Sequence, residues 1–277
     1  APGAPGRFRV LLNGQALAAT FGTEGAEWHW QDGGTVQITD ASKPLELRLH
    51  DLTGFEGRCD AVVLTTDPGL APPNGDPEMT AWRRKLLGIS DRPADGAEYD
   101  LVVVGGGIAG TCASLSAARL GLKVALVQDR PVLGGNNSSE VRVWLQGARN
   151  KEPFPRVGDV VAELEQERHA HYGPSNTADL YEDGKKLDLV REEKNIDLYT
   201  NHRTNAVETA DGRLQAVVAQ HTTSGCRVRL GSRWFADCTG DGCLGMLAGA
   251  DYDITLQGHM GRCNLWNVID TGKPSPF

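Results

Sequence analysis

A glycine-rich loop between an apolar strand and a helix is the feature that most restricts how this chain can fold. The apolar run at residues 101–104 leads directly into residues 105–110, with the sequence GGGIAG, and then into a segment of helical spacing that ends at Gly121. Residues 123–127 form a second apolar run. Continuous apolar runs are typical of parallel strands covered on both faces. This order predicts a βαβ unit, and therefore an α/β fold with a Rossmann-like domain.

The spacing of the glycines is what a dinucleotide phosphate requires. Gly105 permits a tight turn, Gly107 lets the backbone approach a pyrophosphate, and Gly110 lets the helix pack closely on the sheet. The phosphate then meets N–H groups at the positive end of the helix. A glycine-rich turn that binds nothing is the alternative, which the full strand–loop–helix–strand context disfavours. The candidate contacts in this loop are Gly105, Gly107, Ile108, Ala109 and Gly110.

A ribose partner is expected where the second strand ends. Gln128 stands there, followed by Asp129 and Arg130. Glutamine can hydrogen-bond a ribose hydroxyl, although without charge. A second glycine-pair loop follows, which a simple NAD site does not need and which suits a cofactor that extends past the first pyrophosphate. Its candidate contacts are Gly134, Gly135, Asn136, Ser138 and Ser139.

The rest of residues 99–277 alternates strands and turns. Strands are expected at residues 195–200, 204–207, 214–219, 226–230 and 234–238. The middle ones read as a β-meander inserted before the last strand, which leads into a turn at residues 239–242 and a helix. Ligands of α/β sheets bind where strands end and helices begin. Residues 141–194 read as a substrate-side insertion with an amphipathic helix at residues 157–171.

The N-terminal part differs in character. Residues 1–66 hold short alternating runs separated by turn signals, which favours a segment of a β-sandwich. Its strands are expected at residues 8–12, 35–38, 45–49 and 61–64. Residues 67–98 contain several prolines and read as a linker with one short helix at residues 79–87.

Composition excludes several classes of function. With 28 Lys and Arg against 36 Asp and Glu, the net charge is −8, and no basic footprint for nucleic acid exists. No run of 18 apolar residues exists to span a membrane. The cysteines form no CxxC pair, and Glu167, His169 and His171 read as a charged helix end rather than as a zinc site, which needs three or four converging ligands. No metal site is therefore predicted.

The motifs of residues 100–140 resemble those of the FAD-dependent oxidoreductases of the glutathione-reductase-like superfamily. They are the glycine loop, the sequence QDRP at residues 128–131 and the sequence LGGN at residues 133–136. More narrowly, the chain resembles the bacterial xanthan-lyase-like flavoproteins associated with polysaccharide processing, and residues 52–67 resemble the end of a β-sandwich that accompanies some of them. The resemblance runs from about residue 35 onward. Gln128 departs from the family pattern, which usually has an acid there.

The resemblance implies FAD as the cofactor and a carbohydrate-associated sandwich segment. It places Thr204 near the adenine through its backbone, and the turn with Thr239, Gly240 and Asp241 close to the FAD. It also implies that a full-length protein continues beyond Phe277 with more substrate domain.

An alcohol substrate needs a base that removes its hydroxyl proton. His259 is our first candidate because the ordinary pKa of histidine lies near neutrality. A structural histidine in a glycine-rich turn is the alternative, and Glu140 is a second candidate base. Arg142 stays charged, so it can orient substrate or stabilise developing negative charge.

Together these features predict an FAD-dependent oxidoreductase that oxidises a carbinol of a sugar or glycoside by hydride transfer to the flavin. The alternatives are a redox-neutral flavin-dependent enzyme that eliminates or cleaves carbohydrate, a carbohydrate-binding protein with a vestigial flavin domain, and a plain NAD dehydrogenase. The expected partner is a small-molecule or oligosaccharide substrate. A periplasmic or secreted location is favoured over a cytoplasmic one, and no oligomeric state is predicted.

Overall fold

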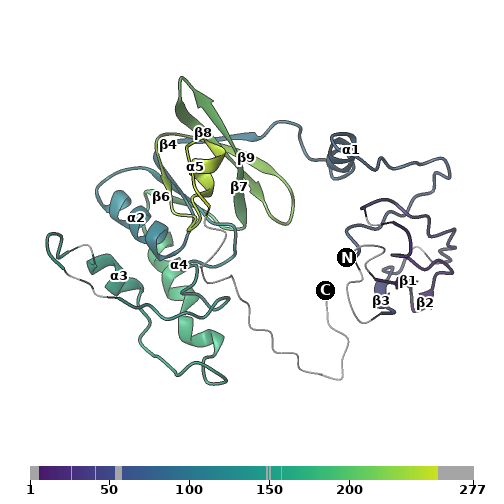
Figure 1. Cartoon of the computed structure of the whole chain (residues 1–277), viewed down its shortest axis with the longest axis horizontal. Helices are drawn as coiled ribbons and strands as arrows, with labels where there is room; N and C mark the ends of the chain where they lie inside the picture. The colour runs from purple at the N-terminus through teal and green to yellow at the C-terminus, as the bar shows by residue number, and fades with distance from the viewer. Residues whose placement is uncertain are drawn as a thin grey trace. The chain divides into compact units, whose positions relative to one another are not determined.

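The computed structural model describes residues 6–25, 27–40, 42–53, 58–147, 149, 151–156 and 158–254 (Figure 1). The chain divides into two compact units, Ala1–Asp91 and Arg92–Phe277.

The first unit is built on a small antiparallel sheet with the order β2-β1-β3. Its strands are β1 (Phe8–Leu12), β2 (Gln15–Ala16) and β3 (Leu47–Asp51). Phe8, Val10 and Leu12 alternate along β1 and point into the core, where Phe21 stacks on Phe8 with ring centroids 5.5 Å apart. The strand expected at residues 8–12 is confirmed, and β3 begins two residues later than expected.

The expected strands at residues 35–38 and 61–64 are irregular in the structure. Within the described residues this unit has one sheet, and a complete sandwich has two, so the expected segment of a β-sandwich stays a prediction. The short helix expected near residue 79 is present as α1 (Glu78–Leu86). It belongs to the first unit, because Trp82 packs edge-on against Trp30 at 5.7 Å and Arg83 pairs with Asp60.

The second unit is a six-stranded mixed sheet with the order β6-β5-β4-β9-β8-β7. The first four strands pair in parallel, whereas β8 pairs antiparallel with both β9 and β7. Their bounds are β6 (Ile196–Tyr199), β5 (Val124–Val127), β4 (Ala94–Val104), β9 (Arg227–Asp237), β8 (Arg213–His221) and β7 (His202–Ala210). The expected α/β fold with a parallel, Rossmann-like sheet is confirmed.

Strand β9 corrects the expected meander. The two strands expected at residues 226–230 and 234–238 are one continuous strand. Gly231 pairs with Ala216 of β8 on one side and with Glu98 of β4 on the other, so the chain passes through without turning. The meander is therefore not a separate insertion, because its third strand is also the last parallel strand.

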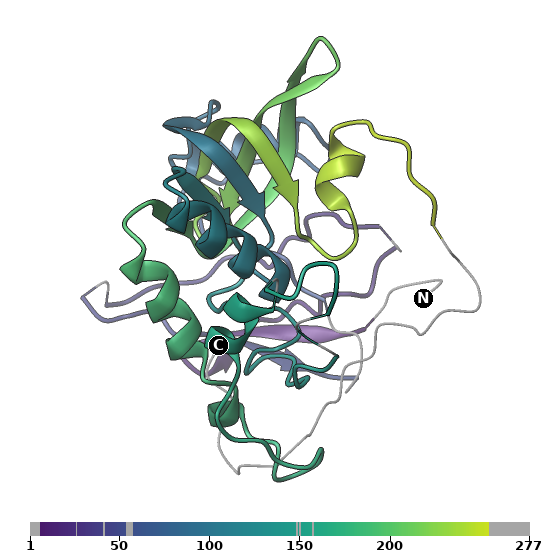
Figure 2. The same ribbon diagram turned by 90° about the vertical axis from the view of Figure 1, so that its left-hand side faces the viewer.

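Helices cover one face of this sheet. They are α2 (Ile108–Arg119), α3 (Asp159–Leu164) and α4 (Asp183–Glu192), and their apolar side chains join one core cluster around Leu115 and Leu126. The opposite face packs with the short helix α5 (Cys243–Leu247), so that in Figure 2 the sheet lies between α5 and the pair α2 and α4.

The region at residues 141–194 differs from its expectation. The amphipathic helix stops at Leu164, because Glu165 takes an extended conformation with φ −66° and ψ 140°. A short 3-10 turn, η1 (Ala178–Tyr181), then precedes α4. Helix α4 leads into β6, the strand beside β5, and its apolar side chains join the core, so this part of the expected insertion belongs to the Rossmann-like domain.

Truncation of the core side of β5 is expected to destabilise the second unit. Leu126 has no exposed surface, so Leu126→Ala should lower the free energy of unfolding by about 2–5 kcal/mol. The matched control is Leu120→Ala, since Leu120 is 83% exposed and its loss should cost within about 0.5 kcal/mol. Urea titration followed by circular dichroism measures both, and equal losses would contradict this core assignment.

Candidate functional site

Two glycines of the loop after β4 are required by packing. Gly105 has φ +102°, and a Cβ there would lie 2.3 Å from the carbonyl oxygen of Cys238 at the end of β9. A Cβ at Gly110 would lie 1.8 Å from the carbonyl oxygen of Gly105. Both contacts are with backbone, which cannot move aside cheaply. The loop therefore holds β4, α2 and β9 together at one edge of the sheet.

Gly107 is different, because the chain leaves room at this position. It precedes α2 in an extended conformation, with φ −63° and ψ 177°, and no side chain caps the helix. A Cβ at Gly107 would meet no atom closer than the Cα of Gly135, at 4.0 Å. The open space lies at the N-terminus of a helix of twelve residues, where N–H groups and the helix dipole favour an anion. The cradle thus fits a pyrophosphate, and a side chain would fill it.

Gln128 has a different place from the one expected. Its side-chain Oε1 accepts a hydrogen bond from the N–H of Gly106 at 2.8 Å, and its Nε2 donates to the carbonyl of Val132 at 3.2 Å. The residue is only 5% exposed. A carboxylate could accept the first bond but could not donate the second, so this bridge requires an amide at residue 128. In the sequence, the one sign of this bridge is that residue 128 is a glutamine and not a charged acid.

The second glycine-pair loop lies directly against the first. The N–H of Gly134 donates to the carbonyl of Gly106 at 2.8 Å, and Gly107 and Gly134 form an isolated parallel bridge. A Cβ at Gly135 would lie 3.1 Å from the Cα of Gly107. Inside this loop the Ser138 hydroxyl donates to the Gly135 carbonyl at 2.7 Å. The structure therefore brings the two loops together, as expected for two parts of one site.

The end of β5 is tied to β7 and to the second loop. Asp129 and Arg130 are exposed there, and Arg130 pairs with Glu140 at 3.3 Å. The N–H of His202 donates to the Gln128 carbonyl at 2.9 Å, which places β7 and its Thr204 beside the end of β5. The Thr204 hydroxyl is buried without a hydrogen-bond partner among the described residues.

The turn after β9 completes this edge of the sheet. The Asp237 carboxylate accepts hydrogen bonds from the N–H and hydroxyl of Thr239, at 3.1 and 2.7 Å, and from the N–H of Gly245 at 2.9 Å. Burial alone would raise the pKa of Asp237, but these hydrogen bonds hold it below its ordinary value. The Thr239 hydroxyl also accepts from the N–H of Cys243. Thr239 therefore fixes the turn, in which Gly240, Asp241 and Gly242 are exposed.

Arg142 lies where it supports backbone. Its Nε donates to the carbonyl of Ser139 at 2.9 Å and its Nη1 to the carbonyl of Asn176 at 3.3 Å. The backbone of Arg142 has φ +62°, an unusual conformation for a residue with a side chain. These contacts are those of a positioning residue, and its role toward a substrate stays a prediction.

His259 lies outside the described residues. No group of His, Cys, Asp and Glu within the described residues could hold a metal ion.

Comparison with known proteins gives one extended match. A family model described as FAD dependent oxidoreductase matches residues 100–264. Among curated proteins, the aerobic glycerol-3-phosphate dehydrogenase of Staphylococcus aureus (strain USA300) is 42% identical over 82 residues, which cover 29% of this chain and 14% of that protein. The same enzyme from strain COL matches equally. The chain thus spans only a small part of the length of these relatives.

Solved structures show weaker likenesses. L-proline dehydrogenase from P. horikoshii is 18% identical with a TM-score of 0.32, over 54% of this chain and 24% of that one. The apo Sdh1 complex of Mycobacterium smegmatis is 14% identical with a TM-score of 0.37, over 52% of this chain and 34% of that one.

No helix in the described ranges is long and apolar enough to cross a membrane.

Substitution at Gly110 should damage the fold itself. In Gly110→Ala the new methyl group meets backbone at 1.8 Å, so we expect a loss of about 3 kcal/mol or more in the free energy of unfolding. The control is Gly184→Ala in α4, where a Cβ meets nothing within 4 Å and a gain of about 0.5–1 kcal/mol is expected. Urea unfolding of the cofactor-stripped proteins measures both. A Gly110→Ala protein as stable as wild type would show that this loop is not packed as described.

Proposed function

This chain belongs to the FAD-dependent oxidoreductase family, and we propose that the loops at residues 105–110, 134–139 and 239–242 bind the FAD together. The observation that carries this proposal is the contrast among the three glycines. Packing explains Gly105 and Gly110, whereas at Gly107 a side chain would occupy only the open cradle at the N-terminus of α2. A bound pyrophosphate supplies the reason for glycine there.

The other proposed contacts with FAD come from residues at the same edge of the sheet. The N–H groups of the first turn of α2 would hold the pyrophosphate, and the exposed Asp129 beside the end of β5 is better placed for the ribose than Gln128, whose amide is already bonded. Thr204 lies on the same side, where its backbone would meet the adenine. The second glycine loop and the turn with Asp241 would line the flavin side of the cofactor.

For the reaction, the proposal is oxidation of a carbinol in a sugar or glycoside. FAD, when bound, supplies the hydride acceptor. The matching relative is named a glycerol-3-phosphate dehydrogenase, which supports a carbinol as the group oxidised. A base of this chain must take the hydroxyl proton, and His259 remains the proposed residue. Arg142 would act by holding the second loop in place.

Gly107 provides the sharpest test of the cofactor site. Gly107→Ala and Gly107→Val should fold, with a loss of no more than about 1 kcal/mol, because the backbone conformation suits any residue. Each should weaken FAD binding by about tenfold or more, since losing one charge-assisted hydrogen bond to phosphate costs about 1.5–3 kcal/mol. Flavin absorbance after gel filtration and titration of the stripped protein measure this.

The control for that test is Gly75→Ala in the first unit, where a Cβ also meets nothing within 4 Å. It should retain the wild-type flavin content. A Gly107→Val protein that purifies with normal flavin would remove the glycine loop from the site.

The substrate class has its own test on the full-length protein. Anaerobic mixing with a panel of mono- and oligosaccharides should bleach the flavin band for at least one of them. Bleaching by glycerol 3-phosphate alone would keep the carbinol and remove the sugar. Bleaching only by amines or thiols would contradict the carbinol proposal. Turnover of a sugar without any electron acceptor would instead identify redox-neutral chemistry.

A further inference from the structure

A fully buried lysine lies beneath the second glycine loop, and none of the roles discussed so far accounts for it. Lys186, on α4, has no exposed surface. On the same helix Val190 is buried in the apolar core and Leu187 packs against it. Burying an ammonium group is costly unless hydrogen bonds and an opposite charge compensate it. The Nζ of Lys186 donates to the carbonyl of Tyr181 and lies 4.0 Å from the carboxylate of Asp183. Burial lowers the pKa of Lys186, and Asp183 counters that shift.

The stem of this lysine supports the loop from below. A Cβ added to Gly134 would lie 3.1 Å from the Cδ of Lys186 and 2.2 Å from the carbonyl oxygen of Asn137. Gly134 itself has φ +105°, which favours glycine. The loop therefore rests directly on the lysine side chain, with no space for another residue between them.

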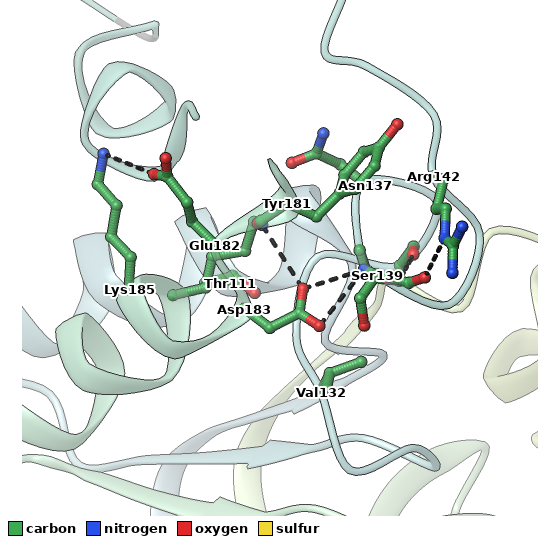
Figure 3. A network of polar contacts seen from close by, with 12 residues as sticks. Thr111, Val132, Asn137, Ser139, Arg142, Tyr181, Glu182, Asp183 and Lys185 are labelled. Carbon is green, nitrogen blue, oxygen red and sulfur yellow. Dashed lines mark hydrogen bonds and ion pairs between the residues drawn. The ribbon is translucent and has the colours of Figure 1, made fainter. Parts of the chain in front are cut away.

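Asp183 holds the other end of the same loop. Its two carboxylate oxygens accept from the N–H of Ser139 at 3.1 and 3.3 Å. Asp183 is in the first turn of α4, where the helix dipole also favours a negative charge. On the other side the carbonyl of Ser139 accepts from Arg142, so Figure 3 shows Ser139 between Asp183 and Arg142. Both polar groups of this residue's main chain are thus fixed by charged side chains.

A rigid support stands behind these contacts. Arg142 and Asn176 bond each other's carbonyl groups, and the hydroxyl of Tyr181 donates to the Asn176 side chain at 2.9 Å. Trp144 stacks on Tyr181 with ring centroids 4.4 Å apart. The segment before α4 is therefore held to residues 142–144 by hydrogen bonds and ring stacking.

We propose that Asp183 and Lys186 are positioning residues, a charged clamp on α4 that fixes residues 134–139 against the glycine loop and thereby sets the position of the flavin. The clamp acts at Gly134 and Ser139, and Gly134 in turn bonds the carbonyl of Gly106. The part that concerns the flavin rests on the proposed function. The part that concerns the loop does not, because every contact lies within the chain.

The test uses Asp183→Ala, because an asparagine would keep an oxygen that can accept from the Ser139 N–H. Lys186→Met removes the charge and keeps the stem, and the double variant combines both changes. The control is Asp188→Ala, since Asp188 is an exposed residue of the same helix. In the cofactor-stripped protein, hydrogen exchange of the peptide covering residues 134–140 should be at least tenfold faster in Asp183→Ala and in Lys186→Met. It should be unchanged in Asp188→Ala. Unchanged exchange in both clamp variants would overturn the proposal, whatever the cofactor does.

The second measurement is made on the FAD-loaded full-length protein. We expect the visible circular dichroism of the flavin and its reduction potential to change in both clamp variants, with FAD binding weakened several-fold. A merely structural role would leave these flavin signals as they are in any protein that still binds FAD. The double variant should recover unfolding stability, because it removes both charges together, without recovering the wild-type flavin spectrum.

The outcomes separate this proposal from the proposed function. Faster exchange with wild-type flavin signals would overturn the positioning role while leaving FAD binding intact. A wild-type protein that binds no FAD would overturn the proposed function, and the exchange measurement would still decide whether the clamp holds the loop.

Discussion

The close contact between the glycine loop and the end of β9 is the constraint on which the second unit depends. Gly105 leaves no room for a side chain against the Cys238 carbonyl, and Gly110 leaves none against Gly105. This contact sets β9 parallel to β4, so the turn after β9 emerges beside the turn after β4. The second glycine loop then bonds the first through Gly134. Three loops therefore meet at this edge: Gly105 lets the first loop approach the end of β9, and the Gly134 hydrogen bond joins the second loop to the first.

Much of the structure at this edge could be predicted from the sequence, because it depends on patterns in short stretches of residues. The apolar runs, the glycine spacing and the position of Gln128 predict the βαβ unit and the sets of residues that the structure brings together. The turn of residues 239–242 follows a strand, as expected. What local signals do not contain is the partner of each polar group. Gln128 stands where a ribose ligand is expected, and only the structure shows that its amide bridges Gly106 and Val132. Arg142 stands where it could orient a substrate, and only the structure shows that it also bonds the carbonyls of Ser139 and Asn176.

The features that the sequence analysis missed also depend on partners from elsewhere in the chain. No role is assigned to Lys186 from the sequence, and it is fully buried because it bonds the carbonyl of Tyr181 in the turn before α4 and lies near Asp183 in the first turn of the helix. Residues 231–233 lie between two strands that were expected to be separate, yet Gly231 pairs with strands on both sides. In the first unit, alternation at residues 35–38 does not produce a strand, since alternation marks a strand only where another strand lies beside it to pair.

A glycine in such a motif can be required by the packing of the chain or by a ligand, and this structure distinguishes the two cases. At Gly105 and Gly110 the chain itself demands glycine, so these residues would be needed even in a fold that binds nothing. At Gly107 the chain makes no such demand, because the backbone is extended and the nearest atom to an added Cβ is 4.0 Å away. Only the middle glycine therefore bears on a ligand. The alternative of a vestigial flavin domain predicts that this position is open to substitution, whereas a working FAD site predicts that it is the one glycine whose replacement spares the fold and loses the cofactor.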